Sequence, residues 1–598
     1  MCGICGSLSL VSLPVDDGPV RAMLASMVHR GPDAEGLIRE PGIVAGVRRL
    51  AVIDLAGGGQ PIANEDGNVQ VVYNGEIYNF EELRDELGSR GHRFRTRTDT
   101  EVLVHLWEEH GPEMVHRLNG MFAFCIHDRR TRETFIARDR LGIKPLFYAH
   151  DGDRLIFASE IAVLLRHGAV RGEVDPAALT ELFCLQFVSG PGTVYRDVRK
   201  LPPGHSMHVR DGELAVRRWY EIPRPAAEAG VGLDARAEEL RQLLRSSVDY
   251  RKISDVPLGT FLSGGIDSTV ITGVLASLVE GPVETFSVGF EGAAGHDERE
   301  YARQASEHYR THHHELLVSP VDIAEHLPRL IEHLAEPVMD PALIPTYLLS
   351  RFAREKVTVV LTGEGADELF GGYKRYLYQA RYGWLAHLPG ARQAGRGALG
   401  AWLPRRVEQA LGAMAEGDPA RSHLEWASVI GSRIAATLFD HDTFDDYERR
   451  IVDHYAAYFS DERSLADGLR ADQSEWLPHN LLAKVDRASM AVSLEARVPF
   501  LDHRLVDWAA TLPDEMRIHG GVTKSVLREA YRDVLPPSIV QRDKMGFDLP
   551  LDSWIRGPLR SLTTDMLGEA NLSRWDGLNA AAVTEMLGQH LQQKQTPI

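Results

Sequence analysis

Three short apolar runs, each ending in or beside glycine, constrain the fold of the second half of the chain more than any other feature. They read VPLGTFLSGG (256–265), VETFSVGF (283–290) and VTVVLTGEG (357–365), and segments with helical spacing separate them. Short apolar runs of this kind are typical of buried strands, and strands that alternate with helices form βαβ units. The second half is therefore predicted to contain a doubly wound parallel sheet, and sheets of this kind bind ligands at the C-terminal ends of their strands.

The first part of the chain has a different pattern, rich in short strands with few helices. Runs such as VQVVYNGEIYN (69–79) and MFAFCIHD (121–128) alternate or are apolar, and turn residues bound them. This pattern predicts an α+β layered domain over residues 1–220. A stretch rich in Pro, Gly and Ala at 221–235 is predicted to be a linker, which leaves 236–598 as the second domain.

Composition and charge exclude several classes of protein. The net charge of -19 over 598 residues argues against a general nucleic-acid-binding surface. No stretch approaches the length of a membrane span, and the N-terminus lacks the pattern of a signal peptide. Four cysteines in so long a chain argue against a disulfide framework and favour a reducing compartment. We expect a cytoplasmic protein that binds neither nucleic acid nor a membrane.

The segment FLSGGIDST (261–269) joins a strand end, two glycines and a helix start. Glycine lets backbone N–H groups approach a ligand closely, and a helix N-terminus favours an anion. Ser263 and Ser268 can donate to phosphate oxygens, and Asp267 offers an oxygen ligand of the kind that Mg²⁺ prefers. A plain glycine turn is the alternative. The full Ser-Gly-Gly-x-Asp-Ser pattern favours a phosphate loop, although not a Walker A loop, since the Gly-Lys-Ser/Thr ending is missing.

A group of carboxylates follows the third apolar run. Glu364, Asp367 and Glu368 lie within five residues, and they would repel one another without a cation or a basic group among them. A metal-bound nucleotide or an amine nucleophile would satisfy that requirement. A solvated acidic helix start, where carboxylates interact favourably with the helix dipole, is the alternative.

These segments, with NLLAKVDRASMAVSLEARVPFLDH (480–503) and KMGFDLPLDSWIRG (544–557), resemble the synthetase domain of glutamine-hydrolysing asparagine synthetases. The resemblance implies that ATP adenylylates a carboxylate, that pyrophosphate leaves, and that ammonia then displaces AMP. Glu364 would be the general base that deprotonates ammonia, and Lys544 would stabilise developing negative charge.

The resemblance also implies the binding residues of this domain. Asp267 and Asp367 would hold Mg²⁺. The acceptor would contact Glu368, Lys484 and Arg487. The ATP site would consist of Leu262, Ser263, Gly264, Gly265, Asp267, Ser268, Val288, Thr362 and Gly363.

Five segments of the first domain, in order, resemble the class II glutamine amidotransferase domain. This resemblance implies an N-terminal-nucleophile fold, a sandwich of two sheets between helices (αββα). The segments are RGPDAEG (30–36), RRLAVIDL (48–55), YNGEIYNFEELR (73–84), TRTDTEV (96–102) and a longer one that runs from LNGMFAF to RDRLGIKPLFY (118–148).

Cys2 becomes the first residue once the initiator methionine is removed. A thiolate is a strong nucleophile, and an α-amino group with a pKa of about 7.7–8.0 can serve as a local base. Only a cysteine at a free N-terminus carries both groups on one residue. The resemblance implies that Cys2 attacks the amide of glutamine, forms a thioester and releases ammonia.

The glutamine site follows from the same resemblance. Asn74 and Gly75 match the oxyanion hole, and Arg49 can bind the glutamine α-carboxylate with two hydrogen bonds. Glu76 and Asp99 can bind the α-amine. The neighbouring backbone consists of Leu50, Ala51, Val52 and Ile53. A surface basic pair and a hairpin turn are the alternatives for RRL and NGE taken alone.

Two further patterns could indicate metal or redox chemistry. Cys2 and Cys5 spell Cys-x-x-Cys, but Cys5 is better interpreted as a small buried residue. THHHE (311–315) has three adjacent histidines, and neighbours on a strand point to opposite faces, which argues against a shared metal.

The chain as a whole is expected to be an ATP-dependent, glutamine-hydrolysing amidotransferase that uses Mg²⁺ and, by default, L-aspartate as the acceptor. Ammonia would travel between the two sites through an internal passage. The same chemistry on another carboxylate acceptor is one alternative, and an inactive regulatory or binding homologue is another. A stand-alone glutaminase is disfavoured by the ATP loop. A homodimer is also considered.

Overall fold

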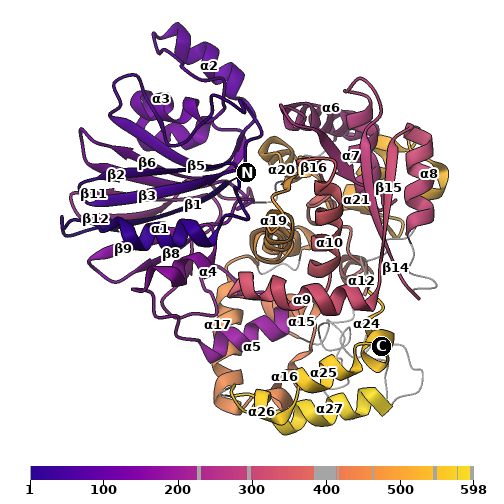
Figure 1. Ribbon diagram of the computed structural model, residues 1–598. Coiled ribbons are helices and arrows are strands. Elements are labelled where there is room, and N and C mark those ends of the chain that lie inside the picture. Colours follow the sequence, from indigo (N-terminus) through magenta and orange to yellow (C-terminus); the bar gives the residue numbers. More distant parts are fainter. Residues whose placement is uncertain are drawn as a thin grey trace.

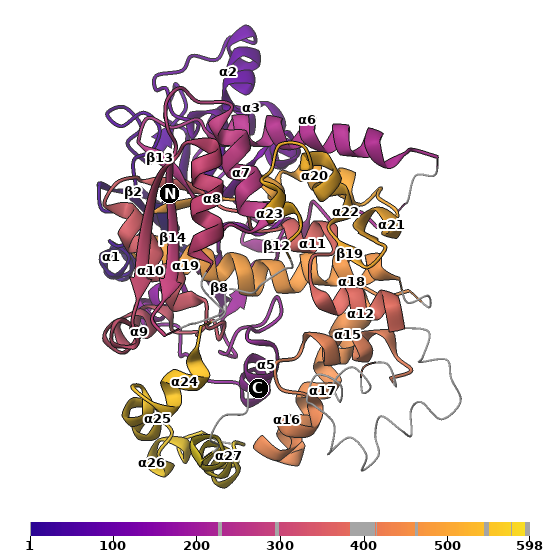
Figure 2. The ribbon, with the colours of Figure 1, turned by 90° about the vertical axis from the view of Figure 1, so that its right-hand side faces the viewer.

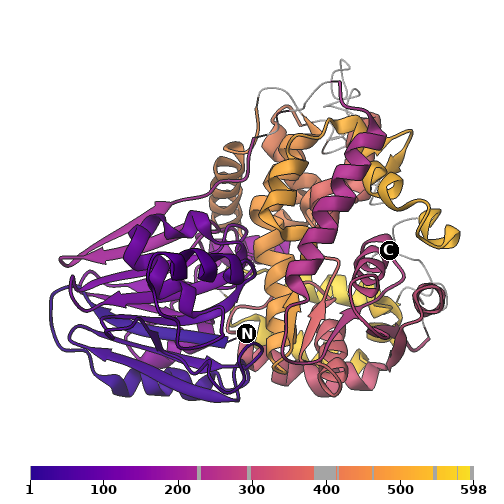
Figure 3. The same ribbon diagram turned by 90° about the horizontal axis from the view of Figure 1, so that it is seen from above.

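The protein is described by a computed structural model, which covers residues 2–224, 226, 230–292, 298–382, 413, 416–460, 464–542, 549–575 and 577–592. Two units lie side by side, one built on sheets and one dominated by helices (Figure 1 and Figure 3). Within the described residues, no helix is both long enough and apolar enough to cross a membrane.

The first unit contains two antiparallel sheets that lie face to face. Their strand orders are β10-β8-β9-β1-β3-β2 and β12-β11-β7-β6-β5-β4. The strands are β1 (Cys2–Ser9), β2 (Ala34–Glu40), β3 (Ile43–Arg49), β4 (Ile62–Ala63), β5 (Val69–Ile77), β6 (Gly120–Asp128), β7 (Glu133–Arg138), β8 (Phe147–His150), β9 (Arg154–Ala158), β10 (Arg199–Lys200), β11 (His205–Arg210) and β12 (Glu213–Arg218).

Helices cover the outer faces of both sheets (Figure 1). On the first sheet these are α1 (Asp17–Ser26) and α4 (Ile161–Leu164), and on the second they are α2 (Phe80–Ser89) and α3 (Glu101–His110). The predicted αββα sandwich is thereby confirmed. Successive side chains of a strand point to opposite faces, so Cys2 packs between the sheets while Cys5 packs against Val20 and Met23 of α1. The two thiols therefore do not form a pair.

The second unit contains a five-stranded sheet in the order β15-β14-β13-β16-β17, and every pairing in it is parallel. Its strands are β13 (Leu258–Phe261), β14 (Glu284–Phe290), β15 (His312–Val318), β16 (Val359–Leu361) and β17 (Glu495–Arg497). In chain order the sheet runs 3-2-1-4-5, so the direction of winding reverses between β13 and β16. Ligands of such sheets bind beyond the strand ends at this switch point.

Helices pack on both faces of this sheet, which confirms the predicted doubly wound architecture. Val359 and Leu361 of β16 face α7 (Ile266–Ala276), whereas Val360 between them faces α10 (Leu343–Arg354) and α19 (Leu482–Met490). Around them lie α6 (Leu233–Arg251), α8 (Arg299–Tyr309), α9 (Pro320–Leu334), α11 (Ala366–Phe370), α20 (His503–Ala509) and α22 (Ser525–Tyr531).

A further group of helices gathers at the lower end of Figure 2. They include α5 (Pro176–Leu185), which comes from the first part of the chain and packs against α17. The others are α15 (Pro419–Ala427), α16 (Ser432–Leu438), α17 (His441–Ala456), α24 (Leu551–Arg556), α25 (Arg560–Met566), α26 (Glu569–Leu572) and α27 (Ala580–Gln592).

Buried ion pairs join the two units. The Arg30 side chain is fully buried, and its Nη1 lies 2.9 Å from both Glu160 of the first unit and Asp486 of α19. Its Nε also donates to the carbonyl of Cys2. Arg497 of the edge strand β17 approaches Glu76 of the first unit at 3.4 Å. A buried charge is tolerated only with such partners. These ion pairs therefore fix the position of one unit relative to the other.

Replacing Arg30 with alanine is expected to destabilise the full chain by about 3–5 kcal/mol, because the buried carboxylates of Asp486 and Glu160 would both lose the guanidinium that they share. Denaturant titration measures the loss. Arg39→Ala is the control, since Arg39 pairs with Asp17 at the surface, where a pair contributes about 0–1 kcal/mol. Equal losses in both variants would contradict a special role for the buried pair.

Candidate functional site

Cys2 opens β1 and lies in a small pocket of the first unit. It is buried, and in the β1–β3 register it stands opposite Arg49. Its backbone N–H donates to Oδ1 of Asn74 at 2.9 Å, and Nε2 of Gln60 lies 4.0 Å from its Sγ. Burial raises the pKa of the thiol, while a backbone hydrogen bond from Leu50 and the charge of Arg49 act in the opposite direction. A base that accepts the thiol proton would therefore favour nucleophilic attack.

Asn74 and Gly75 lie on β5 beside this thiol. With its Oδ1 held by Cys2, the Asn74 side chain keeps a buried Nδ2 that has no hydrogen-bond partner among the described residues. A buried donor without a partner is costly unless a ligand uses it. A Cβ at Gly75 would lie 2.1 Å from the carbonyl oxygen of Met121, so only glycine fits there. The geometry suits a pair of donors for an oxyanion.

Two buried carboxylates lie in the same pocket. Oε1 of Glu76 accepts no hydrogen bond from the described residues. Burial, with the nearby charges of Asp99 and Glu495, holds the pKa of Glu76 well above its usual range. Asp99 accepts from the Tyr73 hydroxyl at 2.9 Å and from the Ile77 backbone at 2.8 Å, and burial raises its pKa as well. An ammonium group bound here would stabilise both carboxylates in their charged form.

Arg49 has more partners than its sequence context indicated. Its guanidinium donates to the carbonyls of Ile53, Asp54 and Leu55 at 3.1, 2.8 and 3.3 Å, and so closes the loop that forms one wall of the pocket. The pocket brings together most of the predicted glutamine-site residues, namely Cys2, Arg49, Leu50, Val52, Ile53, Gly75, Glu76 and Asp99. Ala51 and Asn74 do not line it: the Ala51 backbone N–H donates to Asp33, and Asn74 accepts from the Cys2 backbone beside the pocket.

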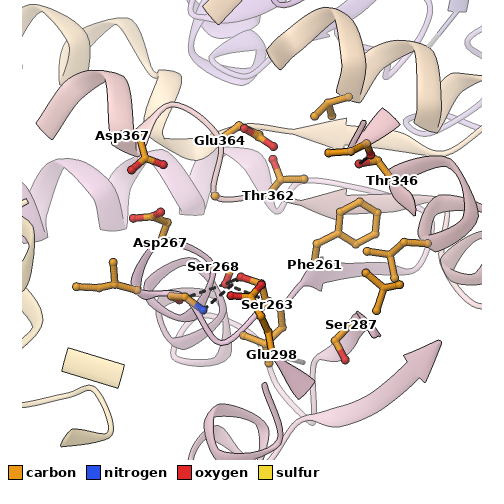
Figure 4. A pocket seen from close by; sticks show the side chains of 18 of the residues that line it. Phe261, Ser263, Asp267, Ser268, Ser287, Glu298, Thr346, Thr362, Glu364 and Asp367 are labelled. Atoms are coloured by element: carbon orange, nitrogen blue, oxygen red, sulfur yellow. Dashed lines mark hydrogen bonds between the residues drawn. The ribbon is translucent and has the colours of Figure 1, made fainter. Parts of the chain in front are cut away.

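A larger cavity of about 230 Å³ lies at the switch point of the parallel sheet. Figure 4 shows residues from the ends of β13 and β16 facing into it. The predicted residues that line it are Leu262, Ser263, Gly265, Asp267, Ser268, Val288, Thr362, Gly363, Glu364, Asp367 and Lys484. Gly264, Glu368 and Arg487 do not line it, and Lys544 lies outside the described residues.

The loop between β13 and α7 is tightly folded. The Ser268 hydroxyl accepts from the Ser263 backbone at 3.2 Å, and the two hydroxyls lie 3.1 Å apart. Gly264 has a φ of +71°, and a Cβ there would lie 2.5 Å from Tyr301. These contacts place the loop and the first turn of α7 around the cavity, an arrangement that suits phosphate.

Lys524 is a site residue that sequence reasoning missed. Its Nζ donates to both carboxylate oxygens of Asp267, at 2.7 and 2.6 Å, and lies 2.7 Å from Oδ1 of Asp367. The two carboxylates face each other across the cavity (Figure 4). Hard oxygen donors paired in this way fit Mg²⁺. Lys524 follows a two-residue strand and belongs to none of the quoted segments, so no local pattern marked it.

Arg542 is a second missed residue. It lines the same cavity, donates from Nη1 to the carbonyl of Gly264 at 3.2 Å and pairs with Glu298 at 2.5 Å. It therefore joins the C-terminal part of the chain to the phosphate-loop candidate.

The residues predicted for the acceptor are separated in space. Lys484 lines the cavity and its Nζ donates to Asp340 at 2.8 Å. Arg487 donates to the carbonyl of Glu336 and lines a different, small cavity between the two units. Glu368 is buried and accepts a hydrogen bond from the Tyr373 hydroxyl.

The three adjacent histidines point to alternating faces, as their strand position predicts. His312 and His314 both approach Glu284, whereas His313 lies between the hydroxyls of Thr285 and Ser287. Within the described ranges, these three side chains do not converge on one point.

Comparisons with known proteins cover nearly the whole chain. Residues 239–597 match the family model described as asparagine synthase, and residues 1–220 match that of the glutamine amidotransferase domain. Asparagine synthetase (glutamine-hydrolyzing) 1 of Bacillus subtilis is 32% identical over 618 residues, which cover 99% of this chain and 94% of that protein. Asparagine synthetase (glutamine-hydrolyzing) 3 of the same organism is 32% identical and covers 92% of this chain and 87% of its own length.

A solved structure, glutamine phosphoribosylpyrophosphate amidotransferase from B. subtilis, matches 53% of this chain and 81% of its own, with 15% identity and a TM-score of 0.29. The fold described above rests on the sheets of this chain alone.

The buried carboxyl of Glu368 predicts a pH-dependent stability. Burial and the charge of Asp367 raise its pKa to about 8, against about 4.3 in an unfolded chain. Between these two pH values the folded state keeps a proton on Glu368 that the unfolded state has lost. The stability of the folded state therefore falls as pH rises towards 8.

Glu368→Gln keeps a neutral side chain at every pH, so the melting temperature of this variant relative to the unchanged protein is expected to increase between about pH 5 and 8. Thermal melts across this range measure the difference, with the exposed Glu355→Gln as the control. A difference that does not vary with pH would contradict the raised pKa.

Proposed function

This chain belongs to the family of glutamine-hydrolysing asparagine synthetases, and we propose that it transfers the amide nitrogen of glutamine to L-aspartate, with ATP converted to AMP and pyrophosphate. The observation that carries the proposal is the pairing of two pockets in one chain. One contains a buried nucleophile that lies beside an unused amide donor, and the other lies at the switch point of a parallel sheet of the type that binds nucleotides.

In the first pocket, removal of Met1 would leave the α-amine of Cys2 as the local base. That nitrogen already donates to Asn74 at 2.9 Å, which orients it beside its own thiol. The thiolate would attack the glutamine amide carbon, and the oxyanion would accept hydrogen bonds from Asn74 Nδ2 and the Gly75 backbone. Ammonia would leave, and water would hydrolyse the thioester to glutamate. Glu76 and Asp99 would hold the α-ammonium group of the substrate.

In the second pocket, the loop from Ser263 to Ser268 would hold the phosphates of ATP. Asp267 and Asp367 would hold Mg²⁺, which supplies neutralisation of phosphate charge. The acceptor carboxylate would attack the α-phosphorus of ATP. This step would form an acyl-adenylate and release pyrophosphate. Glu364, which lines the same cavity, would take a proton from ammonia as it attacks the acyl carbon and AMP leaves. Lys544 remains the predicted stabiliser of developing charge.

The two pockets lie on either side of one interface, which supports direct passage of ammonia between them. The Thr362 backbone N–H, beside the second pocket, donates to the carbonyl of Arg497 at 2.9 Å, and the Arg497 guanidinium lies 3.4 Å from Glu76 of the first pocket. A further cavity of about 30 Å³ is lined by residues of both units, among them Arg30 and Arg487. We also propose the cytoplasm as the compartment, because all four cysteines are free. The homodimer stays a prediction.

Cys2→Ala is expected to abolish glutamine-dependent synthesis and to leave ammonia-dependent synthesis intact, because the nucleophile lies only in the first pocket. Product formation with glutamine and with an ammonium salt as alternative nitrogen sources measures the two activities. Cys5→Ala is the matched control, since that thiol faces α1. Loss of both activities in Cys2→Ala would contradict separable sites.

The acceptor is tested by supplying a panel of carboxylic acids with ATP, Mg²⁺ and ammonia. We expect AMP and pyrophosphate to form in equal amounts with L-aspartate, and not with acids that lack its length and charge. If only another acid supported turnover, that acid and not aspartate would be the acceptor. The absence of pyrophosphate with every acid would favour the regulatory or binding homologue.

A further inference from the structure

Four side chains that could bind a metal converge away from both pockets. Glu65 lies between β4 and β5, His92 follows α2, and His105 and Glu108 lie on α3. One ligand atom from each residue falls within 4.8 Å of all the others. The His105 side chain is fully buried, and the His92 side chain is 12% exposed.

Three of the separations between these residues are close to those of a tetrahedral site. Nδ1 of His105 lies 3.3 Å from Oε2 of Glu108 and 3.5 Å from Oε2 of Glu65. Nδ1 of His92 lies 3.7 Å from Oε2 of Glu108. With metal–ligand bonds of about 2.0–2.2 Å, neighbouring ligands of a tetrahedron are roughly 3.4 Å apart. The side chains therefore need little movement to share one ion.

Three of the four outward-facing atoms of the same residues have hydrogen-bond partners. Nε2 of His92 lies 3.1 Å from Glu109, whereas the buried Nε2 of His105 has no hydrogen-bond partner among the described residues and lies 3.9 Å from Glu101. Oε1 of Glu108 accepts from Asn64 at 2.7 Å, and Oε1 of Glu65 accepts from the Arg93 backbone at 2.8 Å. Carboxylates behind ligating histidines, and hydrogen bonds behind ligating carboxylates, orient the ligands of metal sites in this way.

We propose that Glu65, His92, His105 and Glu108 form a structural site for Zn²⁺ or a similar divalent transition-metal ion. Imidazole and carboxylate together suit such ions, and four protein ligands close the coordination sphere, as in structural rather than catalytic zinc sites. The site would join three separate segments of the first unit.

The position of the site gives it a consequence for the first pocket. Helix α3 begins at Glu101, two residues after Asp99, and Glu101 accepts from the backbone N–H groups of Arg95 and Thr96. An ion on α3 and His92 would therefore brace the segment that presents Asp99. Only this consequence rests on the proposed function; binding of the ion does not.

The test uses the full chain, purified without a metal-affinity step and stripped with a chelator. Equilibrium dialysis against Zn²⁺, followed by elemental analysis, is expected to give one tightly bound ion per chain. The absorption of bound Co²⁺ reports whether the site is tetrahedral. His92→Ala and Glu65→Gln are expected to lose the ion, and Glu109→Gln is expected to weaken binding by about 10–100-fold.

Two controls separate this site from other binding. His150→Ala removes an exposed histidine of the same unit and is expected to keep the ion, as is Cys2→Ala, which excludes binding by the thiol. Added Zn²⁺ should raise the melting temperature of the unchanged protein but not that of Glu65→Gln. Glu65→Gln keeps an oxygen that can accept from Arg93, so this variant is expected to fold.

Failure of the unchanged protein to bind the ion, or equal binding by Glu65→Gln, would overturn the proposal and leave a cluster of histidine–carboxylate ion pairs. Weaker glutamine hydrolysis after chelation, measured without ATP or Mg²⁺, would support the bracing of Asp99. Ion binding without that effect would overturn only the bracing.

Discussion

The arrangement of both pockets depends on the buried guanidinium of Arg497. It donates to Glu495 at 2.6 Å and to the carbonyls of Arg251 and Ile253 at 2.7 Å each, and it reaches Glu76 across the interface. A buried charge of this kind requires all its partners to be present together. One side chain therefore joins the edge of the parallel sheet, the end of α6 and Glu76 of the first pocket.

Both pockets also bring acidic side chains close together inside the protein. Burial raises the pKa values of Glu76 and Asp99, and a bound ammonium group would lower the free energy of their charged forms. In the second pocket Lys524 lies between Asp267 and Asp367 and limits their repulsion. The charged groups of each pocket thus limit which ligand charges that pocket can accept.

The sequence predicted the parts of the molecule that are built from contiguous patterns. The αββα sandwich, the parallel sheet and the loop from Ser263 to Ser268 followed from apolar periodicity, glycines and matched segments. Lys524, Arg542 and the cluster around His105 could not be predicted, because their partners come from distant segments and only the folded chain brings them together. The three-residue strand β17 was too short to show periodicity, although it forms the sheet edge at the interface. The contacts of Arg49 with backbone carbonyls could not be predicted either, because every residue has a backbone carbonyl whatever its side chain.

The pair formed by Arg30 and Asp486 joins positions that are 456 residues apart in the chain. N-terminal units generally fold first during synthesis. The first unit can therefore form its sheets early, but Arg30 meets Asp486 only after nearly five hundred residues have left the ribosome. Until then the interface side of the first unit lacks its partners, among them the Arg497 guanidinium that lies beside Glu76 of the first pocket.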